Sequence, residues 1–157
     1  MNRAVARTVL LPDPAATRTL GARIARALEP GDLVALEGPL GAGKTALARA
    51  ILAALGVAGE VPSPTFTLVQ TYETLRGEAW HVDLYRLRHA EETRELGLED
   101  AFATAICLVE WPDRLGAALP DDRLAVALAF ADGAEARRAD LIGHGAWAER
   151  IDDVLDA

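Results

Sequence analysis

The residues best suited to chemistry in this chain lie in one glycine-rich stretch, residues 38–45, which reads GPLGAGKT. Glycines lack a Cβ, so successive backbone N–H groups can point at an anion, and a following helix adds the partial positive charge of its N-terminus. The pattern GxxxxGK[ST] therefore predicts a loop that holds the phosphates of a nucleotide, a P-loop. Fifteen of the sixteen basic residues are arginine, and the single lysine, Lys44, stands where a compact ammonium would reach the β- and γ-phosphates.

Each position of this loop has an expected role. Lys44 should contact phosphate, and the hydroxyl of Thr45 should be a ligand of Mg²⁺. The other residues expected to line the nucleotide here are Gly38, Gly41, Ala42, Gly43 and Ala46. Together they predict binding of a nucleotide with Mg²⁺, which is ATP or ADP if the base is adenine.

Two carboxylates are candidates for holding the metal and the attacking water. Glu110 ends the apolar run at residues 106–109, and Asp83 ends the run at residues 80–82. A P-loop site needs an acidic group at the end of a neighbouring strand, because Mg²⁺ prefers oxygen ligands. We expect Lys44, Asp83 and Glu110 to be the catalytic residues and Glu110 to serve as a metal ligand. The alternative is that either carboxylate only caps a loop.

Hydroxyl and aromatic residues nearby form a further group. Ser63, the only serine of the chain, precedes Pro64 and Thr65 in a turn stiffened by proline. The hydroxyls of Ser63 and Thr65 either sense the γ-phosphate or Mg²⁺, as switch segments do in other NTPases, or merely cap the turn. Trp111 follows Glu110 directly, and it packs against the nucleotide pocket, faces a partner or is a core indole.

The elements around these residues occur in the order that an α/β protein needs. Asp13 and Pro14 predict the start of a helix, residues 33–36 a strand buried on both faces, and residues 45–55 the helix after the loop. Further strands are expected at residues 65–72, 79–85, 105–110, 123–130 and 137–142, the first two as an antiparallel pair, and helices at 89–102 and at the C-terminus. We predict one domain over residues 1–157, an α/β P-loop NTPase-like sandwich with a mainly parallel central sheet plus antiparallel strands.

Composition and charge exclude several other classes. The 157 residues are 51% hydrophobic, yet no apolar run is long enough to span a membrane, so we expect a cytoplasmic protein. A formal net charge of −8 argues against direct binding of nucleic acid through a basic surface. Cys107 is the only cysteine and is expected to be buried and inert, and the three histidines lack the spacing of zinc ligands.

Five short segments, in their order and spacing, resemble one known family. They are LPDPAAT at 11–17, GPLGAGKT at 38–45, SPTFTLV at 63–69, HVDLYRL at 81–87 and ICLVEWP at 106–112. The family is TsaE, formerly YjeE, the small ATPase required for the bacterial tRNA modification N6-threonylcarbamoyladenosine. The resemblance implies a compact α/β protein that binds ATP with Mg²⁺, works with the partner proteins TsaD and TsaB, and meets tRNA only indirectly through that complex.

The same resemblance assigns roles to individual residues. It implies that Asp83 and Glu110 serve the metal and the attacking water, and that Trp111 is functionally sensitive. It also implies that the segment at 11–17, with Leu11 and Thr17, forms the wall on the adenine side. The family commonly has a second threonine where this chain has Ala46, and often a polar residue in place of Pro39.

The base and the reaction are open to alternatives. Guanine-specific GTPases resemble one another in an Asn/Thr-Lys-x-Asp motif, which this chain cannot contain because Lys44 is its only lysine. Adenine is therefore favoured. We expect slow ATP hydrolysis by the protein alone and faster hydrolysis in the complex. A small-molecule kinase and a non-catalytic module that docks when nucleotide binds are the two rival functions.

Overall fold

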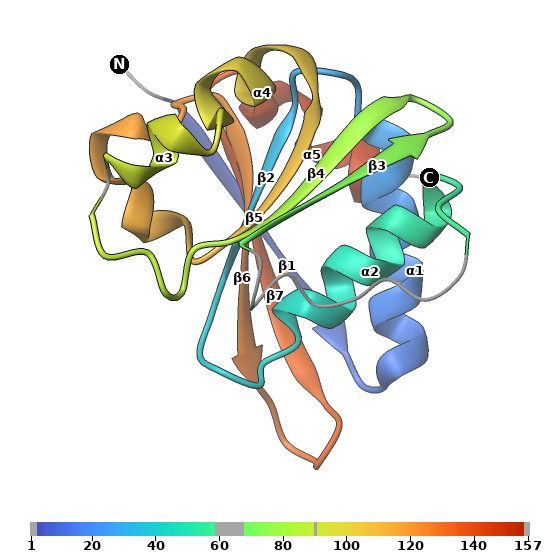
Figure 1. Cartoon of the computed structure of the whole chain (residues 1–157). Helices are drawn as coiled ribbons and strands as arrows, with labels where there is room; N and C mark the ends of the chain where they lie inside the picture. The colour runs from blue at the N-terminus through green and yellow to red at the C-terminus, as the bar shows by residue number, and fades with distance from the viewer. Residues whose placement is uncertain (1–2, 59–67, 90, 156–157) are drawn as a thin grey trace.

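The computed structural model describes residues 3–58, 68–89 and 91–155 of the chain. Seven strands form one sheet, and helices pack against both of its faces (Figure 1). The strands are β1 (Ala4–Leu11), β2 (Leu33–Glu37), β3 (Val69–Thr74), β4 (Gly77–Asp83), β5 (Ile106–Glu110), β6 (Arg123–Phe130) and β7 (Arg137–His144). The helices are α1 (Pro14–Ala27), α2 (Lys44–Ala54), α3 (Glu92–Glu95), α4 (Leu98–Thr104), the 3₁₀ helix η2 (Pro112–Ala118) and α5 (Trp147–Leu155).

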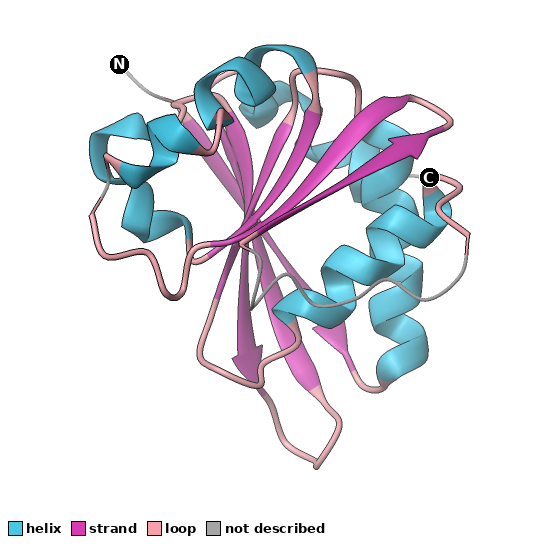
Figure 2. Ribbon diagram, in the orientation of Figure 1, coloured by secondary structure: helices cyan, strands magenta, loops and turns pink. Residues whose placement is uncertain are grey.

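The sheet is parallel at its centre and antiparallel at its edges. Its strand order is β1-β7-β6-β2-β5-β4-β3. Figure 2 shows the strands of this sheet in magenta. Strands β6, β2, β5 and β4 run parallel to one another, while β3 pairs with β4, β7 with β6, and β1 with β7 in the antiparallel sense. This arrangement confirms the predicted fold class. The carboxyl ends of the four parallel strands therefore meet at one edge of the sheet.

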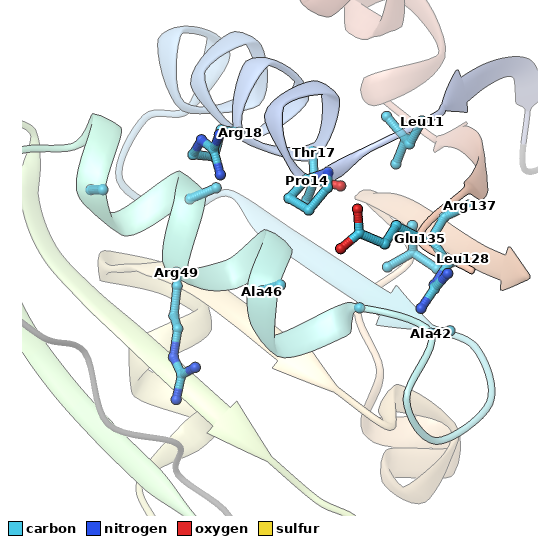
Figure 3. A pocket seen from close by; sticks show the side chains of 13 residues that line it. Leu11, Pro14, Thr17, Arg18, Ala42, Ala46, Arg49, Leu128, Glu135 and Arg137 are labelled. Atoms are coloured by element: carbon cyan, nitrogen blue, oxygen red, sulfur yellow. The ribbon is translucent and has the colours of Figure 1, made fainter. Parts of the chain in front are cut away.

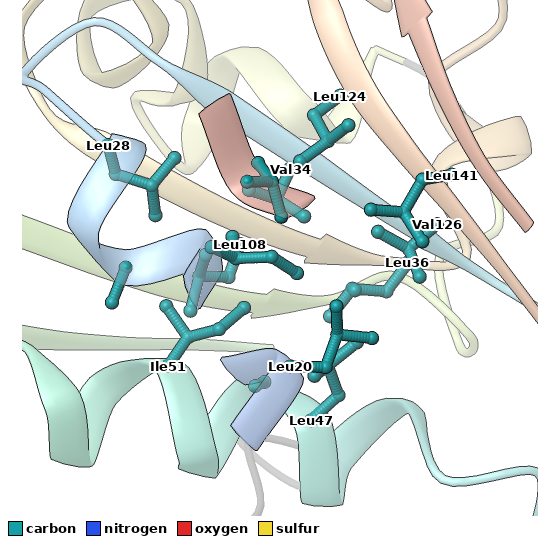
Figure 4. Packing of buried hydrophobic residues seen from close by; sticks show 14 of the residues in the cluster. Leu20, Leu28, Val34, Leu36, Leu47, Ile51, Leu108, Leu124, Val126 and Leu141 are labelled. Carbon is teal, nitrogen blue, oxygen red and sulfur yellow. The ribbon is translucent and has the colours of Figure 1, made fainter. Parts of the chain in front are cut away.

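The unbroken apolar sequence of β2 follows from burial on both faces. Val34 and Leu36 pack in the cluster that includes residues of α1, α2 and α5 (Figure 4), and Leu33 and Ala35 pack in the cluster that includes α4 and η2. Successive side chains of a strand point to opposite faces, so the first four residues of β2 supply both cores, two residues to each. This double burial holds β2 rigidly in place immediately before the glycine-rich loop.

The helix that follows β1 begins where the sequence predicts. The backbone N–H of Ala16 donates to the Asp13 carboxylate at 2.9 Å, and Pro14 occupies the first turn of α1. The buried side chains Leu20 and Ile24 then face the sheet. With 14 residues, α1 is a helix of ordinary length. No helix in the described ranges is both long and apolar enough to cross a membrane.

Strand β1 was not predicted. It pairs with β7 along its whole length, from Ala4 opposite His144 to Leu11 opposite Arg137. Most of its side chains are exposed, and only Leu11 is buried, so the segment carries no apolar run that marks a strand. Its conformation depends on hydrogen bonds to a strand more than 120 residues away. The expected strand at 65–72 begins at Val69 in the described part of the chain, and residues 65–67 lie outside that part.

Cys107 lies on β5 with no exposed surface, as the sequence predicts. Burial, with a smaller contribution from the negative charge of Glu78, raises the pKa of the Cys107 thiol to about 12. Because the thiolate is the reactive form, we expect the folded protein to react with a thiol reagent at pH 8 roughly 1,000-fold more slowly than the unfolded chain. Absorbance of the released reagent, with and without guanidinium chloride, measures both rates. Rapid labelling of the folded protein would contradict this burial.

Candidate functional site

The glycine-rich loop joins the end of β2 to the start of α2. Gly38 has a φ of 137°, and a Cβ built there would collide with the carbonyl oxygen of Leu128 on β6. Gly43 has a φ of 107° immediately before α2, in the left-handed region that side chains disfavour. Glycine is therefore required at both positions, for a close approach at the first and for backbone conformation at the second. The helix N-terminus that results is free of any side-chain cap.

Lys44 is held against its own loop. The Lys44 side chain is nearly buried, and its Nζ donates to the carbonyl oxygens of Gly38 at 2.6 Å and Pro39 at 3.1 Å. The same nitrogen lies 4.1 Å from the centroid of the Trp111 ring, in cation–π geometry. Burial lowers the pKa of the Lys44 ammonium, and the negative charges of Glu110 and Asp83 act in the opposite direction. The Lys44 ammonium therefore lies between the backbone of the glycine-rich loop and the Trp111 ring.

Three polar side chains lie on the sheet face that α2 covers. Asp83 and Glu110 end the parallel strands β4 and β5 and stand opposite each other in register. His81 is two residues before Asp83 on the same strand, hence on the same face. The Thr45 hydroxyl, in the first turn of α2, lies 2.8 Å from Glu110 Oε1 and 3.0 Å from Oε2. His81 Nε2 is 2.7 Å from Glu110 Oε2.

Trp111 turns sharply away from the end of β5. Its φ of 60° is unusual for a residue with a side chain, and its ring centroid lies 5.0 Å from that of Tyr85. The backbone N–H of Tyr85 in turn donates to the Asp83 carboxylate at 3.0 Å. Trp111 is half-buried, with Lys44 against its ring. Of the three predicted settings for Trp111, the geometry favours packing at the pocket wall.

Two cavities adjoin at the start of α2. The first, of about 410 Å³, is lined among others by Lys44, Thr45, Asp83, Glu110 and Trp111. The second, of about 510 Å³, lies between α1, α2 and the β6–β7 turn (Figure 3), and Leu11, Thr17 and Ala42 line it. Gly41 lines the first cavity, whereas Gly43 and Ala46 line both. Each volume is in the range of small-ligand sites.

The oxygen atoms near Thr45 suit Mg²⁺. The Thr45 hydroxyl and the Glu110 carboxylate are hard oxygen donors that already lie within hydrogen-bonding distance of each other. Within the described ranges, no three His, Cys, Asp or Glu side chains form a metal-binding group. Mg²⁺ usually keeps several waters and takes phosphate oxygens, so one or two protein oxygens are enough. The residues present therefore fit a magnesium ion that arrives with a nucleotide.

Some of the residues at these cavities were not predicted, and some predicted residues cannot be placed. His81, Tyr85 and Arg86 join the carboxylate end of the site, and their one local clue was that they lie with Asp83 in the segment HVDLYRL at 81–87. Glu135 and Arg137 line the larger cavity from the β6–β7 turn, which no local pattern connects with the loop. Ser63 and Thr65 lie outside the described residues.

Known proteins are similar to this chain over most of its length. Residues 11–139 match the model of the family described as threonylcarbamoyl adenosine biosynthesis protein TsaE. The chain is 38% identical to the tRNA threonylcarbamoyladenosine biosynthesis protein TsaE of Haemophilus influenzae, over 87% of this chain and 89% of that protein. The protein of the same name from Streptomyces coelicolor is 40% identical, over 88% of this chain and 98% of the relative.

A solved structure is similar as well. The crystal structure of Bacillus subtilis YdiB superposes with a TM-score of 0.81 at 26% sequence identity. The similarity covers 98% of this chain and 97% of that one, so it extends over the whole sheet and its helices. The family model and the curated relatives confirm the resemblance found in the five sequence motifs. This chain belongs to the TsaE family.

Proposed function

We propose that this protein binds ATP with Mg²⁺ on the loop at residues 38–45 and hydrolyses it in support of tRNA threonylcarbamoyladenosine biosynthesis. The observation that carries the proposal is the contact of the Thr45 hydroxyl with the Glu110 carboxylate at 2.8 Å, directly beside the Lys44 ammonium. A metal-binding hydroxyl, a strand-end carboxylate and a phosphate-binding cation are the parts that P-loop hydrolysis requires. No transfer to a second substrate is needed to account for any of them.

In this proposal the nucleotide occupies both cavities, with its phosphates in one and its base and ribose in the other. The triphosphate occupies the 410 Å³ cavity, where it replaces the carbonyl oxygens of Gly38 and Pro39 as the partner of Lys44. Gly41 and Gly43 present backbone N–H groups to the phosphates. The adenine and ribose occupy the 510 Å³ cavity against Leu11 and Thr17. Its mostly apolar wall suits a planar base.

Hydrolysis requires that a water be held in line with the γ-phosphate. The Thr45 hydroxyl can donate its hydrogen to Glu110 while its lone pairs face the metal. When bound, Mg²⁺ supplies neutralisation of the phosphate charge that grows in the transition state. Glu110 and Asp83, side by side at the ends of β5 and β4, accept hydrogen bonds from the attacking water and orient it. The metal-contacting carboxylate in this proposal is Glu110, because it touches Thr45.

The pathway assignment rests on family membership. Relatives covering most of the chain are named for tRNA threonylcarbamoyladenosine biosynthesis. We assign TsaD and TsaB as partners, with the hydrolysis of ATP resetting their complex. Because a protein with a net charge of −8 repels the phosphate backbone of tRNA, we assign the contacts with tRNA to those partners.

Turnover with and without the partners tests this function. We expect slow release of labelled γ-phosphate to water by the protein alone, and faster release after TsaD and TsaB are added together. Omission of Mg²⁺ should abolish both rates. Transfer of the label to a metabolite would instead favour a small-molecule kinase. ATP binding without any Mg²⁺-dependent turnover, alone or with the partners, would favour a nucleotide-gated docking module.

A further inference from the structure

His81 contacts the Glu110 carboxylate from the neighbouring strand of the sheet. It lies on β4 with no exposed surface, and its Nε2 is 2.7 Å from Glu110 Oε2. The neighbouring side chains Ala79 and Leu108 belong to the apolar cluster under α2. A residue that served only to pack there would be apolar, because a buried polar ring is costly without a partner. The presence of a polar ring here therefore indicates that His81 serves to contact Glu110.

The surroundings of the imidazole indicate where its hydrogen lies. His81 Nδ1 is buried and has no hydrogen-bond partner in the part of the chain that the structure describes. A hydrogen on Nδ1 would leave a buried donor unsatisfied, which costs more than an unused lone pair. Glu110 also accepts the hydroxyl hydrogen of Thr45, so its carboxylate acts as an acceptor on both sides. The hydrogen is thus assigned to Nε2, which donates to Glu110 Oε2.

We propose that His81 is a positioning residue for Glu110, whose Nε2–H holds one carboxylate oxygen so that the other stays directed at the Thr45 hydroxyl and its magnesium ion. This inference rests on the proposed function, since it assumes that Mg²⁺ arrives with nucleotide at Thr45. A glutamate side chain has three rotatable bonds. Thr45 contacts both carboxylate oxygens, but through the single atom Oγ1, so the plane of the carboxylate can still turn about the line to that atom. Partners that orient a metal-binding carboxylate typically change metal affinity or activity about 10- to 100-fold.

The first test needs no ligand. Long-range ¹H–¹⁵N NMR spectra distinguish the two neutral tautomers of a histidine ring, and the chain has only three histidines to assign. We expect the Nε2–H form for His81 in the nucleotide-free protein, with a downfield Nε2 proton that shifts in the Glu110→Gln variant. A ring with its hydrogen on Nδ1, or a proton unaffected by Glu110→Gln, overturns the proposal.

The second test measures metal affinity in variants. His81→Leu removes the donor, whereas His81→Gln keeps an N–H close to the position of Nε2. We expect His81→Leu to raise the Mg²⁺ concentration needed for half-maximal tightening of fluorescently labelled ADP about 10- to 100-fold. Binding of the labelled ADP in EDTA should stay within about twofold of wild type. His81→Gln should recover most of the Mg²⁺ affinity, and kcat should follow the same order.

Controls separate this inference from the proposed function. His144→Gln, at the opposite end of the sheet on β7, should leave Mg²⁺ affinity unchanged. If His81→Leu does not fold, His81→Asn takes its place, because its shorter amide does not reach Glu110. Wild-type Mg²⁺ affinity in His81→Leu or His81→Asn, or a loss of Mg²⁺ affinity in His81→Gln equal to that in His81→Leu, overturns the positioning role alone.

If Mg²⁺ does not change the nucleotide affinity of the wild-type protein, the proposed function is overturned and with it this role. The tautomer of His81 still reports on the His81–Glu110 contact in that case.

Discussion

Replacing Glu110 with glutamine should lower the rate of ATP hydrolysis about 100- to 10,000-fold, the range in which a positioned proton acceptor contributes to catalysis. Glutamine has nearly the same size, but only one of its two terminal atoms accepts a hydrogen bond. It lacks the second acceptor oxygen of the carboxylate, which Thr45 and His81 contact at 2.8 and 2.7 Å, and it has no charge with which to hold a metal or polarise water. Single-turnover release of labelled phosphate measures the loss.

Nucleotide affinity and fold must be measured on the same variant. We expect Glu110→Gln to bind ATP in EDTA almost as the wild type does, because in our proposal Glu110 acts through the metal and the attacking water, and EDTA removes the metal. Glu73→Gln, an exposed change on β3, is the matched control and should leave the rate unchanged. Asp83→Asn should lower the rate while affecting Mg²⁺ affinity less than Glu110→Gln. Full hydrolysis in Glu110→Gln would be incompatible with a catalytic role for this carboxylate.

Replacing Lys44 with alanine should weaken ATP binding by about 2–5 kcal/mol, which corresponds to roughly 30- to 5,000-fold in Kd, because it removes one side of a nearly buried charge pair. Lys44 is the only lysine of the chain and lies 4.1 Å from the Trp111 ring centroid at the mouth of the loop. No other described side chain offers a compact ammonium there. Isothermal titration with an ATP analogue that cannot be hydrolysed measures the change.

Two further variants show whether charge or shape matters at this position. Lys44→Arg keeps the charge but replaces the compact ammonium, which lies between the Gly38 and Pro39 carbonyls and the Trp111 ring, with a larger planar guanidinium. It should therefore recover only part of the affinity. Arg26→Ala removes an exposed cation from α1 and should bind ATP as the wild type does. Affinity within about threefold of wild type in Lys44→Ala would rule out the assigned phosphate contact.

Local chemistry made a large part of the fold predictable. The α2 helix, the cap of α1 at Asp13 and the buried strands β2 and β5 each carry their own pattern of capping residues or continuous apolar residues. The edge strand β1 carries no such pattern, because its side chains are mostly exposed and only its pairing with β7 defines it. Local sequence patterns predict the elements that interactions between neighbouring residues stabilise, whereas β1 is stabilised by its pairing with the distant strand β7.

The candidate site divides in a similar way. The glycine-rich loop could be predicted because all of its parts lie within eight consecutive residues. Asp83 and Glu110 could be predicted because parallel strands bring their carboxyl ends to one sheet edge. The β6–β7 turn could not be connected with the glycine-rich loop, since Arg137 is 96 residues from Gly41, whose carbonyl oxygen it approaches at 3.5 Å. Nothing in the spacing of these residues predicts that contact.

The sequence by itself determined the family and the fold class and located the glycine-rich loop, because the five motifs, the loop glycines and Lys44 are all short runs of neighbouring residues. Only the tertiary structure decided which carboxylate meets the Thr45 hydroxyl. In the sequence, Asp83 and Glu110 are equivalent as strand ends. The packing of α2 over β4 and β5 places Glu110 within 2.8 Å of the Thr45 hydroxyl. The register of β4 and β5 places His81 behind Glu110, where it can fix the orientation of the carboxylate.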